Sequence, residues 1–126
     1  GNDTLGGGSG EDRMFGGTGD DWMDGGSNHD SLEGGEGDDF LKGGSGGDRF
    51  VFRQDFGNDT ISDFSPDRGD LIVLAPGTTI ADFDDLVANH LREVDGTTEI
   101  YAGLHSIRIE GMDRATFMTH EDNILF

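Results

Sequence analysis

Apolar positions recur with a period of nine residues in the first part of the chain. The segments GGSGEDRMF, GGTGDDWMD, GGSNHDSLE, GGEGDDFLK and GGSGGDRFV align without gaps and follow a partial copy, GNDTLG. Each unit carries an aspartate and, two positions later, an apolar residue. The aspartates are Asp3, Asp12, Asp21, Asp30, Asp39 and Asp48, and the apolar residues are Leu5, Met14, Met23, Leu32, Leu41 and Phe50. This unbroken register indicates internal repeats.

Each unit predicts six turn-forming residues followed by a strand of three residues. Paired glycines permit positive φ, and the apolar residue of the strand points inward between two outward neighbours. A strand this short buries a single side chain, so one unit cannot fold alone and neighbouring units must stack. The pattern therefore predicts an all-β fold, a two-sided coil of short parallel strands over residues 1–52.

The glycine-rich register ends after Phe52, but two later segments keep its spacing. FGNDTISDF and RGDLIVL each have a carboxylate two positions before an isoleucine, Ile61 or Ile72. We interpret them as degenerate repeats that continue the coil. Residues 53–126 are thus expected to combine degenerate repeats with a C-terminal cap of the same domain.

The remaining sequence predicts the elements of this cap. ADFDDLVANHLREV has apolar residues at helical spacing, with Asp82 or Asp84 as N-cap, so a short helix is expected at 82–92. TTEIYA and SIRIEG alternate like strands, and MDRATFMTHEDNILF is typical of a turn or short helix leading into a final strand. Such a cap would cover the open end of the coil.

Composition shows what the fold needs besides apolar packing. Only 32% of the residues are hydrophobic and 23 are glycine, which is lean for packed layers. The chain has no cysteine, and its net charge is −19. A cation held by oxygen ligands is therefore the expected staple, whereas nucleic acid and anionic lipid are unfavourable partners. Glycine-rich acidic chains are often disordered, but the fixed spacing of these carboxylates favours an ordered coil once the cation is present.

The tandem units resemble the GGxGxDxUx nonapeptides of the RTX (repeats-in-toxin) calcium-binding proteins. The resemblance implies a right-handed parallel β-roll in which the turn of each unit stacks on that of the next unit but one, with about five to six Ca²⁺ ions between turns. Asp3, Asp21 and Asp39 would line one edge, and Asp12, Asp30 and Asp48 the other. The ligands would be these carboxylates and backbone carbonyls of the turns. The implied turn residues are Gly1, Gly7, Gly8, Ser9, Gly10, Gly16, Gly17, Thr18, Gly19, Gly25, Gly26, Ser27, Asn28, Gly34, Gly35, Glu36, Gly37, Gly43, Gly44, Ser45 and Gly46.

Two further points concern these turns. Asn28 stands where the family usually has glycine, and asparagine tolerates left-handed backbone geometry. The end of the repeat block, GGSGGDRFVF with GNDTISDF and GDLIVL, is similar to that of serralysin-type secreted metalloproteases and mannuronan C-5 epimerases. This similarity implies that Asp59, Asp63 and Asp70 complete the last calcium sites.

The resemblance implies an extracellular calcium-binding module that folds on Ca²⁺ after type I secretion and stabilises a larger protein. Its partners would be calcium, the secretion machinery and upstream domains. The alternative is a polysaccharide-binding module of an alginate epimerase-like enzyme or adhesin, and a third hypothesis is the C-terminal domain of a protease or lipase. No basic-then-apolar leader or membrane-length apolar run occurs, so any export signal is expected outside this chain or at its C-terminal end.

Catalytic motifs do not stand out from the repeats. The four histidines lie outside any HExxH motif, so we assign no catalytic residue and expect a non-enzymatic module. Trp22 and Phe40 occupy the same repeat position two units apart and should be neighbours on an outward face. They form a candidate ligand patch, although the rings could instead cover the strands or pack on an upstream domain.

Overall fold

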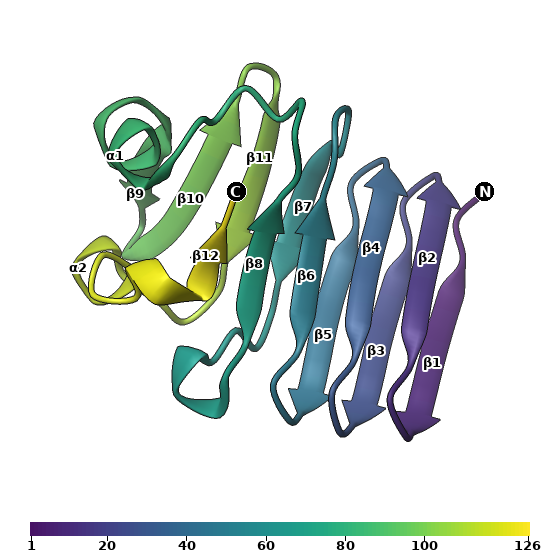
Figure 1. Cartoon of the computed structure of the whole chain (residues 1–126). Helices are drawn as coiled ribbons and strands as arrows, with labels where there is room; N and C mark the ends of the chain where they lie inside the picture. The colour runs from purple at the N-terminus through teal and green to yellow at the C-terminus, as the bar shows by residue number, and fades with distance from the viewer.

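The computed structural model describes residues 1–126 as a parallel β-roll with a C-terminal cap (Figure 1). Odd-numbered repeat strands form one sheet and even-numbered strands form the facing sheet. The first sheet contains β1 (Thr4–Ser9), β3 (Trp22–Ser27), β5 (Phe40–Ser45) and β7 (Asn58–Ile61). The second contains β2 (Arg13–Thr18), β4 (Ser31–Glu36), β6 (Arg49–Phe52) and β8 (Leu71–Leu74). The predicted stacking of each unit on the next but one is confirmed, because every strand pairs in parallel with the strand one coil later.

The strands of the regular repeats are longer than the sequence predicted. β1 to β5 each span six residues and include the glycine pair, where a turn was expected. Pairing continues through the glycines, for example at Gly8 and Gly26, which have φ of 90° and 101°. A Cβ atom on Gly26 would clash with the carbonyl oxygen of Gly8. The second glycine of each pair thus lets the ladder bend without separating the stacked backbones.

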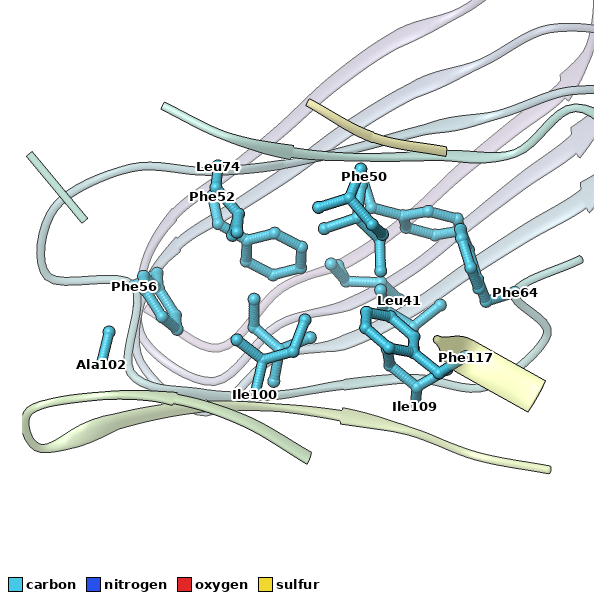
Figure 2. Packing of buried hydrophobic residues seen from close by; sticks show 14 of the residues in the cluster. Leu41, Phe50, Phe52, Phe56, Phe64, Leu74, Ile100, Ala102, Ile109 and Phe117 are labelled. Atoms are coloured by element: carbon cyan, nitrogen blue, oxygen red, sulfur yellow. The ribbon is translucent and has the colours of Figure 1, made fainter. Parts of the chain in front are cut away.

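One inward apolar side chain from each repeat unit forms the core of the repeats. The column on the two sheets is Met14, Met23, Leu32, Leu41, Phe50, Ile61 and Ile72, all buried. Ile61 and Ile72, which come after Phe52, are part of the same column. The core widens toward the C-terminal end, where phenylalanines including Phe52, Phe56 and Phe117 join it (Figure 2). The regular repeats therefore hold much less apolar packing than the capped end.

The cap extends both sheets. β11 (His105–Ile109) pairs in parallel with β7, and β10 (Thr97–Ala102) and β9 (Leu91–Val94) follow in antiparallel order. β12 (Ile124–Leu125) pairs in parallel with β8. The predicted strands and the covering of this end of the roll are confirmed.

The cap also contains short helical segments. α1 (Phe83–Asp85) is followed by a π-helical segment (Leu86–His90), and α2 (Arg114–Phe117) precedes a 3₁₀ turn (Glu121–Asn123); another 3₁₀ turn lies at Pro66–Arg68. Asp82 is the N-cap, since its side chain accepts a hydrogen bond from the Asp85 N–H at 2.9 Å. The helix predicted for 82–92 ends at His90, because Leu91 begins β9 and pairs with Ile100. None of the helices is long and apolar enough to cross a bilayer.

Candidate metal centre

The repeat aspartates form two ladders, one along each edge of the roll. After the first member of each ladder, the Oδ1 atom of every aspartate accepts a hydrogen bond, 2.6 to 2.9 Å long, from the backbone N–H of the aspartate one coil earlier. The ladders are Asp3–Asp21–Asp39–Asp59 and Asp12–Asp30–Asp48–Asp70. This arrangement confirms the predicted division into two edges and extends each ladder by one member. From the second member onward, every aspartate is at most 2% exposed.

The second carboxylate oxygen of the ladder aspartates is buried without a partner. The Oδ2 atoms concerned belong to Asp12, Asp21, Asp30, Asp39 and Asp48. A buried polar atom that lacks a hydrogen bond costs free energy, and a buried charge costs more. Five such atoms in regular array therefore mark positions where a further, positively charged partner is needed.

Backbone carbonyls approach the same positions from the next coil. A methyl group added to Gly7 would lie 2.7 Å from Asp12 Oδ2 and 2.6 Å from the Gly25 carbonyl oxygen. The same test at Gly25 gives 2.5 Å to Asp30 Oδ2 and 2.7 Å to the Gly43 carbonyl oxygen. Each position thus offers a carboxylate oxygen from one turn and a carbonyl oxygen from the stacked turn, the ligand types that Ca²⁺ prefers. No three acidic or histidine side chains converge anywhere in the chain. The donor set fits a hard cation held largely by backbone oxygens.

Burial changes the acidity of several ladder carboxyl groups. Loss of solvation raises the pKa of Asp39, Asp48 and Asp70. Hydrogen bonds that these carboxylates accept from backbone N–H groups lower the pKa, but by less. The same cause raises the pKa of Asp59 to about 8, with added repulsion from Asp39 and Asp38. In the metal-free chain these groups therefore resist ionisation, and a cation beside them would favour the charged form.

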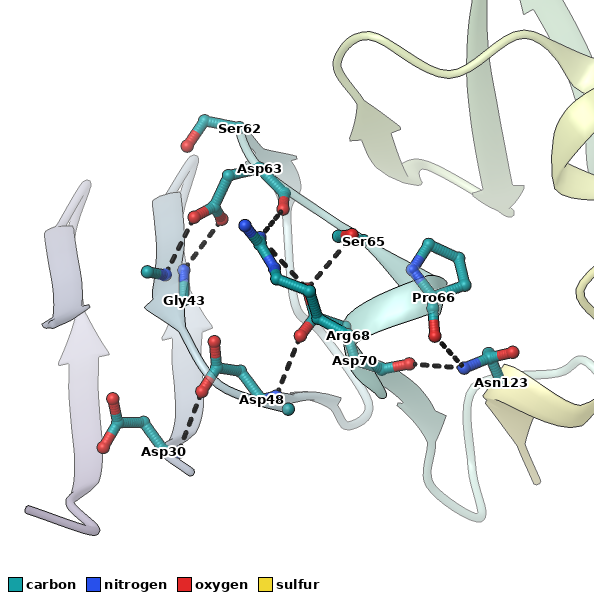
Figure 3. Close-up of polar contacts among 12 residues, drawn as sticks. Asp30, Gly43, Asp48, Ser62, Asp63, Ser65, Pro66, Arg68, Asp70 and Asn123 are labelled. Carbon is teal, nitrogen blue, oxygen red and sulfur yellow. Dashed lines mark hydrogen bonds and ion pairs between the residues drawn. The ribbon is translucent and has the colours of Figure 1, made fainter. Parts of the chain in front are cut away.

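In the last turn of the roll, the carboxylates are held by contacts within the chain. Asp63 lies outside the ladders, and its two oxygens accept hydrogen bonds from the N–H groups of Gly43 and Gly44 at 2.9 and 2.8 Å (Figure 3). The Oδ2 atom of Asp70 accepts from the Ser65 N–H at 2.8 Å and lies 3.9 Å from Arg68. The ligand roles of Asp59, Asp63 and Asp70 stay predictions. Arg68 was not among the residues predicted for this turn, although its position inside the acidic stretch SPDRGD was an available signal.

Asn28 adopts the left-handed geometry expected of it, with φ of 81°.

Trp22 and Phe40 are neighbours on an outward face, as predicted, because they are directly paired in β3 and β5. Their rings stack with centroids 6.4 Å apart and planes 5° from parallel, and Trp22 is 41% exposed. Their role as a ligand patch stays a prediction.

Replacement of Gly25 by alanine should destabilise the calcium-loaded protein, because the new methyl group would intrude on Asp30 Oδ2 and the Gly43 carbonyl. We expect a loss of about 1–3 kcal/mol, the usual cost of overpacking. Gly6→Ala is the matched control, since no atom lies within 4 Å of its added methyl group. Denaturant unfolding at saturating calcium measures both variants. Equal stability of the two would contradict this account of the site.

Two stacked sheets with a ladder of partnerless carboxylates along each edge define a cation-binding parallel β-roll. Residues 1–32 and 24–53 match the sequence model of the RTX calcium-binding nonapeptide repeat, in four copies. Over residues 1–53 the chain is therefore similar to RTX calcium-binding nonapeptide repeats.

Two solved structures resemble the whole chain. The extracellular lipase LipA from Serratia marcescens has a TM-score of 0.70 at 19% identity, over 99% of this chain and 20% of the lipase. The AlgE6R3 subunit of the Azotobacter vinelandii mannuronan C5-epimerase has a TM-score of 0.55 at 25% identity, over 92% of this chain and 78% of that subunit. No curated protein matches the chain. The chain thus shares the fold of one part of the lipase and spans about a fifth of the lipase's length.

Proposed function

We propose that this chain is a non-catalytic calcium-binding module that folds on Ca²⁺ outside the cell and stabilises a larger extracellular protein. The observation that carries this proposal is the set of five buried aspartate oxygens without partners along the two ladders, with backbone carbonyl oxygens of the stacked turns close to them. The proposed ligands are the carboxylates of the ladder aspartates and the carbonyls of the glycine-rich turns. The number of ions, about five to six, is part of the proposal.

The residues of the chain link binding to folding. Each ladder aspartate uses Oδ1 to hold the backbone of the preceding coil, so the carboxylate is buried only when the coils have stacked. With a net charge of −19, stacking brings like charges together and is opposed by repulsion. When bound, calcium supplies the positive charge that offsets these carboxylates. Stacked coils and bound ions therefore form together, and metal binding becomes folding free energy.

The proposed setting is export by type I secretion followed by folding at extracellular calcium levels. Oxygen-rich extracellular modules bind Ca²⁺ with dissociation constants of about 10⁻⁴–10⁻³ M, so such a module stays expanded where calcium is scarce. A chain that remains unfolded until it leaves the cell is suited to passage through a secretion channel. The extracellular location of the lipase that shares this fold supports the same setting. The secretion machinery and upstream domains of the parent protein are the proposed partners.

A calcium titration of the Asp39→Asn variant tests the proposal. Asparagine keeps an Oδ1 acceptor for the Asp21 N–H but replaces the partnerless Oδ2, so it removes the proposed ligand and little else. We expect cooperative folding of the unmodified chain, followed by circular dichroism and Trp22 fluorescence. The calcium midpoint of Asp39→Asn should rise roughly tenfold or more.

Asp38→Asn is the matched control, because Asp38 is adjacent, exposed and bonded through its carboxylate only to Asn58. It removes the same charge from the chain, and its midpoint should move less than about twofold. Similar shifts in both variants would mean that general charge, and not the ladder, sets the calcium response. A spectrum indifferent to calcium would refute the proposed function.

A further inference from the structure

The outward face of the second sheet carries much of the positive charge of this acidic chain. Three of its eight basic residues lie there: Arg13 on β2, Arg49 on β6 and Arg53 directly after β6. Arg13, Ser31 and Arg49 are in register across three neighbouring strands. All three arginines are exposed. We call this surface the arginine face.

Most of the charge on the arginine face is not neutralised within the chain. Glu33 pairs with Arg53, with 2.7 Å between Oε1 and Nε. Arg13 and Arg49 make no ion pair, although Arg13 lies over the ring of Phe15, 4.9 Å from its centroid. Two free guanidinium groups on a molecule of charge −19 form a local site for anions.

Apolar side chains lie among these arginines. A groove of about 440 Å³ is lined by Arg13, Arg49 and Arg53 together with Val51, Val73 and Phe126. Val51 and Val73 are paired in β6 and β8, and Phe15 beside the groove is 51% exposed. The groove therefore offers aliphatic surface and positive charge to the same ligand.

We propose that the groove binds an acidic segment of a partner protein, whose carboxylates pair with Arg13 and Arg49 while an apolar side chain packs on Val51 and Val73. Guanidinium groups suit carboxylates because they form two parallel hydrogen bonds. The aliphatic lining favours a peptide over an acidic saccharide, since a sugar has no aliphatic side chain to fill it. A second copy of this chain is opposed by the repulsion of two strongly negative molecules. The aspartate ladders run along the edges of the roll, so the arginine face is separate from them.

Binding of short peptides to the folded, calcium-saturated chain tests the proposal. The probe is a blocked hexapeptide of four glutamates and two leucines, compared with one carrying glutamine for glutamate and one carrying serine for leucine. We expect amide shifts in the nuclear magnetic resonance spectrum to cluster on β2, β4, β6 and β8, and only the first peptide to bind well. Combined replacement Arg13→Ala and Arg49→Ala should weaken binding about tenfold or more, with calcium-dependent folding unchanged.

Arg114→Ala is the control, because Arg114 lies in α2 of the cap and makes no ion pair. Its affinity for the peptide should equal that of the unmodified chain. The proposal is overturned by absence of peptide binding at millimolar concentration, by equal binding of the glutamine peptide, or by shifts centred on Trp22 and Phe40. Tighter binding of a uronic acid oligomer in the same groove would likewise overturn the assignment to a protein segment.

Discussion

Removal of calcium near neutral pH should unfold the repeat coils of residues 1–52. One ion at a hundredfold excess over its dissociation constant stabilises a native state by about 2.7 kcal/mol, so five independent sites would contribute roughly 13 kcal/mol. That sum is comparable to the whole stability of an ordinary domain, about 5–15 kcal/mol. The repeats bury only one apolar side chain per unit, so little else opposes the repulsion within a chain of charge −19.

Circular dichroism and the hydrodynamic radius, measured in chelator and in millimolar calcium, check this expectation. The radius should expand and the β-signal of the repeats should disappear in chelator, and both should recover on adding Ca²⁺. Magnesium is the control, because it requires a smaller octahedral shell and dehydrates reluctantly. A compact β-roll that persists without calcium would show that apolar packing and backbone pairing suffice.

The repeat part of the structure could be predicted because every unit repeats the same local chemistry. Asp30 and Leu32 illustrate this: the nine-residue register alone assigns one to a ladder and the other to the core, and both are buried as expected. Asn28 could also be predicted, since its position fixes the backbone geometry that it must adopt. Local residue preferences and long-range stacking agree throughout these coils.

Features that depend on pairing between coils could not be predicted from one unit. The strands run through the glycines because stacked backbones pair there, which a single repeat does not reveal. The helix of the cap ends at His90 because Leu91 pairs with β10, although its sequence continues the helical period. Asp63 accepts hydrogen bonds from the N–H groups of Gly43 and Gly44, a contact between segments about twenty residues apart that a single unit does not reveal.

In calcium-free buffer, acid should stabilise the roll. The pKa of Asp59 is about 8 in the folded chain against 3.8 for an ordinary aspartate, and those of Asp39, Asp48 and Asp70 are also raised. A carboxyl group whose pKa is higher in the folded state favours folding fully below the unfolded pKa, and this contribution is lost as pH rises through the folded pKa. Lowering the pH from about 8 to about 5 should therefore add on the order of 4 kcal/mol through Asp59 alone.

Calcium should reverse the sign of this pH dependence, because protons and the cation compete for the same carboxylates. Urea unfolding of the calcium-loaded protein should show stability falling toward acid. The stripped protein, followed by circular dichroism over the same range, should instead regain β-signal toward acid. Asp59→Asn should reduce the acid stabilisation of the stripped protein, because the amide is neutral at every pH. Asp38→Asn should reduce it only slightly, because Asp38 is exposed and its repulsion is the smallest of the effects on the pKa of Asp59. Parallel pH profiles with and without calcium would mean that the buried carboxylates are not the groups that bind the ion.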